Sequence, residues 1–190
     1  MFSSIRRQHG AGLTIPISKE VRHAIQSAGV PTIRQVTPDI AAELRRCRRY
    51  EHRLSVLALG LEPESIRRAL AELGGLTEDQ DPALLKRFEC TAVLILGALL
   101  QDTTRESDTV AYAVEDDLFV LFLPETDAAA ANRAAARLSA TFESRSSIRL
   151  RIGLAEFPRD GYAIEDLLEV ARNGWLERAQ VREPHEVPHG

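Results

Sequence analysis

The sequence of 190 residues has few cysteines, few aromatic residues and no long hydrophobic segment. Its two cysteines, Cys47 and Cys90, cannot form a disulfide framework and are not spaced as a CxxC pair, so we expect reduced thiols. The longest apolar run, residues 91–100, is too short to cross a bilayer, and the first residues lack the apolar core of a signal peptide. We therefore expect a cytoplasmic protein with no membrane insertion.

The sequence also lacks the overall basic charge of a nucleic-acid-binding protein. Its formal net charge is −4, although residues 1–60 carry 10 basic and 4 acidic side chains and the remainder carries 14 and 24. No DNA-recognition motif accompanies the basic part, so we predict no DNA binding. The arginine cluster within residues 45–53 is expected to be a solvated helix face, and a contact for an acidic partner or for ligand phosphates is the less favoured reading.

The hydrophobic pattern predicts one domain in which helices and strands are mixed. An apolar content of 44% is enough to bury a single core. We predict helices over residues 37–50, 63–72, 83–100, 127–142 and 164–179, and strands over residues 54–61, 109–114, 118–123 and 148–155. Thr37 and Pro38 are expected to open the first helix. The order favours an α/β (α+β) fold in which helices cover a central mixed sheet with an internal hairpin.

The predicted elements divide the chain into three parts. Residues 1–36 are expected to form an irregular arm, because Pro16, Gly29 and Pro31 interrupt any regular pattern there. Residues 37–180 are expected to form the folded domain, and residues 181–190 a polar tail.

Two stretches carry more specific information than this general pattern. The first is residues 108–127, a hairpin whose second strand leads into Pro124-Glu-Thr-Asp127. The second runs from Ile152-Gly-Leu-Ala through Pro158-Arg-Asp160-Gly161 into a helix with paired leucines. Their order and spacing resemble the GGDEF (diguanylate cyclase) family, over about residues 37–180. The resemblance implies a nucleotide-cyclase-like fold and a place in bacterial cyclic di-GMP signalling.

That family condenses two GTP molecules into cyclic di-GMP with the help of Mg²⁺, and this sequence departs from it in the signature loop. The loop falls on Glu115, Asp116, Asp117, Leu118 and Phe119. Glu115 and Asp116 replace the two glycines that let the backbone approach the substrate. The family's acidic pair becomes Asp117 and Leu118.

Other family positions are also replaced. The metal-binding aspartate falls on Gly60, the guanine-contacting asparagine and aspartate fall on Arg68 and Cys90, and the phosphate-binding lysine falls on Gln180. Phosphoryl transfer depends on positioning and on charge stabilisation, and Mg²⁺ needs oxygen ligands. The resemblance therefore implies a catalytically inactive domain without a bound metal or other cofactor. A residual GTP-dependent cyclase that uses Asp116 and Asp117 is the least favoured reading.

One family motif is retained, because Arg105-Glu-Ser-Asp108 is an RxxD sequence just before the hairpin. In the family such a motif forms the product-binding inhibitory site, with a second arginine that falls on Arg137. Arginine can bond the O6/N7 edge of guanine with two hydrogen bonds, and aspartate can accept from the N1 and N2 donors. Arg133 lies one helical turn before Arg137 and could reach the same ligand. Asp108 stands one residue farther from the signature loop than in the usual family pattern.

Two functional hypotheses follow. The leading one is an inactive GGDEF-like signalling module that binds cyclic di-GMP through Arg105, Asp108, Arg137 and Arg133 and relays its occupancy to a protein partner. The alternative is a protein-interaction domain that binds no nucleotide. In that case the basic segment 1–53 or the acidic body would dock a partner or a second copy of the chain.

Overall fold

The computed structural model describes residue 25, residues 28–74 and residues 82–180. Within this part of the chain, the elements are α2 (Ile33–Tyr50), β1 (Leu54–Leu61), α3 (Pro63–Gly74), α4 (Pro82–Thr103), β2 (Thr109–Ala113), β3 (Leu118–Pro124), α5 (Ala128–Ser146), β4 (Leu150–Phe157) and α6 (Ile164–Gln180). The predicted order of helices and strands is confirmed. β1 has the predicted bounds, and β4 lies two residues later than predicted because α5 continues to Ser146.

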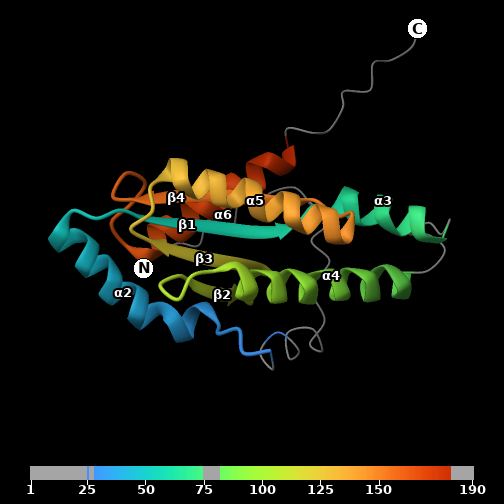
Figure 1. Ribbon diagram of the computed structural model, residues 1–190, viewed down its shortest axis with the longest axis horizontal. Helices are drawn as coiled ribbons and strands as arrows, with labels where there is room; N and C mark the ends of the chain where they lie inside the picture. The colour runs from blue at the N-terminus through green and yellow to red at the C-terminus, as the bar shows by residue number, and fades with distance from the viewer. Residues whose placement is uncertain (1–24, 26–27, 75–81, 181–190) are drawn as a thin grey trace, which may run out of the picture.

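The four strands form one sheet in the order β2-β3-β1-β4 (Figure 1). All pairs in it are antiparallel, so the expectation of a mixed sheet was wrong for the described strands, apart from one isolated parallel bridge between Thr32 and Tyr112. The connectivity explains this. Helical crossovers join β1 to β2 and β3 to β4, so the two strands of each pair run in the same direction. They are not neighbours, because β3 lies between β1 and β2, and β1 lies between β3 and β4.

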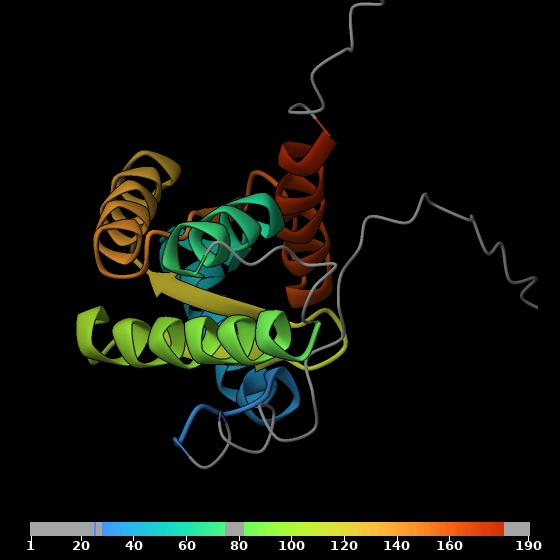
Figure 2. The same cartoon turned by 90° about the vertical axis from the view of Figure 1, so that its right-hand side faces the viewer.

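Helices cover both faces of this sheet. Helices α3, α4 and α5 pack on one face, and α2 and α6 pack on the other, so α5 and α6 lie on opposite sides of the sheet in Figure 2. Along β1 the side chains alternate between the two layers: Leu57 and Leu59 face α3 to α5, whereas Val56 and Ala58 face α2 and α6. This central strand is therefore buried on both faces, which accounts for its almost unbroken apolar sequence.

Helix α2 begins four residues before the predicted start at Thr37. Thr32 precedes the first turn, and Gln35 Oε1 accepts the Thr32 backbone N–H at 2.7 Å. Thr37 instead donates its hydroxyl to the carbonyl of Ile33, and Pro38 lies inside the helix. The capping interaction at Thr32 fixes the start, because it satisfies a backbone group that would otherwise lack a partner.

The segment just before α2 is part of the folded domain. Ile25 and Val30 are buried in the core, and the carbonyl of Pro31 accepts the backbone N–H of Tyr112 at 2.8 Å. The predicted boundary at residue 36 therefore falls too late. The remainder of the predicted arm and the predicted tail, residues 181–190, lie outside the described residues.

Charged side chains close the turn that follows β4. The buried carboxylate of Glu156 is paired with Arg53 and with Arg159. Asp160 accepts the backbone N–H of Glu156 at 2.8 Å and pairs with Arg159 at 2.7 Å. The Arg159 guanidinium holds the pKa of Asp160 below its ordinary value, and the Glu156 N–H acts in the same direction. This explains the Pro-x-Asp-Gly sequence after β4 as a turn that a charged aspartate stabilises.

We predict that Asp160→Asn lowers the free energy of unfolding by about 1 kcal/mol near neutral pH, since it removes a charge-assisted contact with a partly exposed arginine. Because the pKa of Asp160 is lower in the folded state, its contribution is present above the ordinary aspartate pKa and is lost as the pH falls through the folded value. Urea unfolding at several pH values should therefore show the two proteins converging in acid. A constant difference down to the lowest pH would contradict this, and Glu177→Gln on exposed α6 surface is the control.

Candidate functional site

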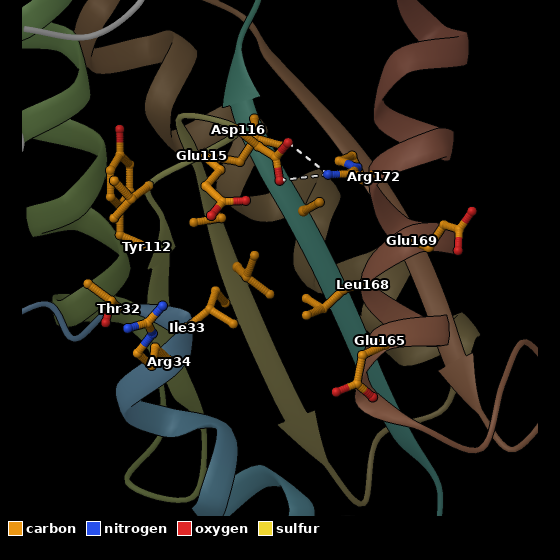
Figure 3. Close-up of a pocket in the computed structure, with 15 residues that line it drawn as sticks. Thr32, Ile33, Arg34, Tyr112, Glu115, Asp116, Glu165, Leu168, Glu169 and Arg172 are labelled. Atoms are coloured by element: carbon orange, nitrogen blue, oxygen red, sulfur yellow. Dashed lines mark hydrogen bonds and ion pairs between the residues drawn. The ribbon is translucent and has the colours of Figure 1, made fainter. Parts of the chain in front are cut away.

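A pocket of about 640 Å³ opens between the start of α2, the β2–β3 hairpin and α6 (Figure 3). Its apolar lining includes Ile33, Ala58, Leu118, Val120 and Leu168. Its charged lining consists of Arg34, Glu115, Asp116, Glu165, Glu169 and Arg172. The pocket thus combines an apolar wall with charged groups of which four are acidic and two basic.

An ion pair joins the hairpin to α6 at one side of this pocket. Arg172 Nη1 donates to the two carboxylate oxygens of Asp116 at 2.8 and 3.0 Å, as the dashed lines in Figure 3 show. Asp116 and Arg172 also line a neighbouring pocket of about 420 Å³, which extends along α6 to Trp175 and Leu176. We call the two pockets together the hairpin groove. The pair spans the groove and fixes the hairpin to the helix.

The five residues that the resemblance places at the signature loop have different surroundings in the structure. Glu115 and Asp116 line the groove, whereas Asp117 adopts a left-handed conformation (φ 55°) and its carboxylate accepts the Tyr112 hydroxyl at 3.0 Å. Leu118 and Phe119 are buried, Leu118 on the α2 and α6 face of the sheet and Phe119 on the other. The acids of the hairpin therefore do not converge on one point.

Gly60 lies where the resemblance places the metal-binding aspartate, and its surroundings are filled. A Cβ atom at this position would lie 2.6 Å from Leu118 Cδ2 and 2.8 Å from Trp175 Nε1. A carboxylate could enter only if these two buried side chains moved. Among the described residues, no group of three or more His, Cys, Asp or Glu side chains is placed to hold a metal ion.

The other three positions that the resemblance assigns to substrate contacts, Arg68, Cys90 and Gln180, do not carry acidic side chains. Arg68 is exposed on α3, and Cys90 is half-buried on α4. The side chain of Gln180 lies outside the described part of the chain. Trp175 is 9% exposed, as expected for a core residue, but its indole N–H has no hydrogen-bond partner. The indole has thus taken the space beside Gly60 at the cost of one unsatisfied donor.

The retained RxxD sequence forms a closed turn between α4 and β2. The backbone N–H of Arg105 donates to Asp108 Oδ2 at 2.9 Å, and the Asp108 N–H donates to the Arg105 carbonyl at 3.0 Å. The structure therefore brings Arg105 and Asp108 together, and the extra residue before the signature loop does not separate them. One oxygen of the Asp108 carboxylate is used to hold the turn.

Arg133 and Arg137 lie on α5, which packs beside α4 on the same face of the sheet. Both side chains are exposed, as is that of Arg105. Within the described part of the chain, no ion pair or side-chain hydrogen bond engages the guanidinium of any of these three arginines. By contrast, the guanidinium groups of Arg46, Arg53, Arg149, Arg159 and Arg172 are all paired with carboxylates.

The sequence did not suggest the groove residues on α6 or at the start of α2. Glu165 and Glu169 are one helical turn apart, and Arg172 follows three residues later, so these positions share one helix face. This spacing in the sequence predicts a charged face of the helix. The contact of Arg172 with Asp116 joins residues 56 positions apart, and no local pattern predicts it.

No family model and no curated protein matches the sequence. Solved structures are similar. The GGDEF domain of the Pseudomonas aeruginosa protein YfiN (TpbB) superposes with a TM-score of 0.63 and 21% identity, over 80% of this chain and 91% of that one. The chain has the fold of GGDEF domains. No helix among the described residues is long and apolar enough to cross a membrane.

Two further solved GGDEF structures contain a ligand or a partner. The GGDEF domain of Caulobacter crescentus DgcB in complex with c-di-GMP has a TM-score of 0.59 and 10% identity, over 80% of this chain and 84% of that one. The diguanylate cyclase SiaD of P. aeruginosa, in complex with its activator SiaC, has a TM-score of 0.60 and 16% identity, over 86% of this chain and 63% of that one. At these identities, the similarity concerns the fold.

Proposed function

We propose that this chain is a catalytically inactive GGDEF-like module that binds cyclic di-GMP through Arg105, Asp108, Arg137 and Arg133. The observation that carries the proposal is the closed turn of Arg105 and Asp108 at the end of α4, the helix that packs beside α5. The two exposed arginines of α5, like Arg105, have no carboxylate partner in the described part of the chain. Arginines that are not neutralised internally can stack on guanine, bond its edge or bind phosphate. The DgcB complex with c-di-GMP gives the fold a precedent for this ligand.

The packing around Gly60 supports the loss of catalysis. Leu118 and Trp175 occupy the space that a carboxylate at this position would need. Mg²⁺ takes oxygen ligands and holds the phosphates during transfer, so apolar packing at this point removes a requirement of the reaction. We expect no cyclic di-GMP to form when the protein is incubated with Mg²⁺ and GTP, and product above background would overturn this part of the proposal.

Isothermal titration calorimetry with cyclic di-GMP tests the binding. We expect saturable heat in the absence of Mg²⁺, and no heat with cyclic di-AMP, because both arginine and aspartate contacts read the guanine edge. Absence of heat at high micromolar cyclic di-GMP would contradict the proposal. In the proposed function, a partner protein senses whether cyclic di-GMP is bound, because a module that catalyses no reaction can pass on a signal only through a partner.

A second candidate function is a nucleotide-independent protein-interaction domain, and the hairpin groove favours it. Glu115, Glu165 and Glu169 line the groove and have no ion-pair partner among the described residues, next to an apolar wall. This combination fits a segment of a partner that carries both basic and apolar side chains. The SiaD complex with its activator SiaC gives the fold a precedent for a protein partner.

Trp175 allows this candidate to be tested, because it is the single tryptophan of the chain and lines the groove. We expect a lysine- and leucine-rich amphipathic peptide to change its fluorescence, and Glu165→Lys with Glu169→Lys to weaken the peptide at least about 10-fold through charge repulsion. Glu177→Lys, on exposed α6 surface outside the groove lining, is the matched control. Equal weakening by the control would show general charge attraction and would contradict docking in the groove.

A further inference from the structure

The outward face of α4 carries an apolar stripe. Between Cys90 and Gln101 the helix has no charged residue, and Leu94 and Ile95 are each 37% exposed. The exposed residues that form the stripe are Arg87, Thr91, Leu94, Ile95, Ala98 and Asp102. At 3.6 residues per turn these six positions fall within about 100° of the helix circumference. The stripe is thus one continuous face with a charge at each end.

The stripe is self-complementary about its centre. If a two-fold axis passes between Leu94 and Ile95, an antiparallel second copy places its Ile95 against Leu94 of the first. Thr91 then meets Ala98, and these small side chains allow the helices to approach closely. Arg87 meets Asp102 at both ends of the contact, since the two lie equally far from the centre. Opposite charges therefore face each other twice in one dimer.

We infer that two copies of this chain associate through this face of α4 in an antiparallel, two-fold symmetric pair. A two-fold interface uses the same patch on both copies, which is the property that this stripe has. Arg87 and Asp102 have no ion-pair partner within the described part of their own chain, so both are available to a second copy. The antiparallel arrangement also places the opposite ends of the two helix dipoles side by side.

Other arrangements fit this face less well. In a parallel pair, Arg87 would face Arg87 and Asp102 would face Asp102, and both contacts would be repulsive. A single pair of helix faces buries less area than the roughly 1,200–2,000 Å² of a standard interface, so we expect a dimer that forms at micromolar concentration and dissociates on dilution. The pairing needs no dinucleotide, and it is therefore independent of the proposed function.

Sedimentation velocity over a concentration series tests the pairing. We expect the wild-type chain to dimerise, and Arg87→Asp and Asp102→Arg each to weaken the dimer at least about 10-fold, because each places like charges opposite each other. Both residues are exposed, so neither substitution should change the circular dichroism spectrum. Arg45→Asp, at an exposed position of α2, should leave the dimer intact.

Charge exchange tests the two ionic contacts, and the doubly substituted chain tests their antiparallel register. An equimolar mixture of the Arg87→Asp and Asp102→Arg variants restores both opposite-charge contacts, so we expect a heterodimer to form where neither variant dimerises alone. The doubly substituted chain, Arg87→Asp with Asp102→Arg, should dimerise with itself as the wild type does. A monomeric wild type at several hundred micromolar, or a mixture that stays monomeric, would overturn the inference.

Discussion

Replacing Gly153 with alanine is expected to destabilise the folded chain strongly. A Cβ atom at this position of β4 would lie 1.8 Å from the carbonyl oxygen of Ala171 and 2.5 Å from the backbone nitrogen of Trp175. Both are backbone atoms of α6, so no side-chain rotation can relieve the contact. The helix would have to move away from the sheet, and we expect a loss of about 3 kcal/mol or more, a large part of the stability of a domain of this size.

Gly174 provides a matched control on the other side of the same contact. A Cβ atom there would lie 3.5 Å from the Cα of Gly153, which is ordinary van der Waals contact. Gly174→Ala should leave stability unchanged or raise it by up to about 1 kcal/mol, since alanine favours the helix. Urea unfolding followed by circular dichroism measures both variants. Similar stability of Gly153→Ala and wild type would contradict the close packing of β4 and α6.

The same close approach determines the surroundings of Gly60, where the resemblance places the metal-binding aspartate. Because Gly153 lets α6 lie directly on the sheet, Trp175 comes to rest beside Gly60, and Leu118 completes the packing. A single Gly60→Asp substitution would therefore add a charge to a packed apolar layer and would not create a metal site. The apolar packing around Gly60 and the close approach of α6 to the sheet are one structural feature.

Much of the fold could be predicted because its signals are local. The bounds of β1 follow from an uninterrupted apolar run. The hairpin follows from an alternating run and an apolar run on the two sides of the acidic turn at residues 115–117. The start of α2 was missed although Thr32 and Gln35 have the spacing of a capping pair, because Pro38 suggested a later first turn. The capping interaction and the burial of Val36 offset the cost of a proline inside the helix.

The site could be predicted only in part. The resemblance placed Gly60 and Leu118 at positions where the family has acids. The packing of Leu118 and Trp175 beside Gly60 joins three distant segments of the chain, and no local pattern predicts it. The hydrogen bonds between Arg105 and Asp108 were predictable from their spacing, because residues three apart can close a turn. The groove between α2, the hairpin and α6 was not predictable, since it exists only when the helices pack on the sheet.

Replacing Arg105 with alanine is expected to lower the affinity for cyclic di-GMP by about 10- to 150-fold. A hydrogen bond from a charged group contributes about 1.5–3 kcal/mol, and arginine can make two to the guanine edge. The Arg105 side chain is exposed and has no carboxylate partner among the described residues, so its removal should not change the unfolding temperature. Arg145→Ala, an exposed arginine on α5, should retain wild-type affinity in the same calorimetric titration.

The variants Arg105→Lys and Asp108→Asn separate guanine recognition from simple charge attraction. Lysine keeps the charge but loses the two-pronged geometry, so we expect most of the affinity to be lost. Asparagine can still accept the Arg105 N–H and close the turn, but it offers a weaker acceptor to the N1 and N2 donors of guanine. We therefore expect Asp108→Asn to lose affinity without losing stability. Full affinity in both variants would show that these side chains do not read the base.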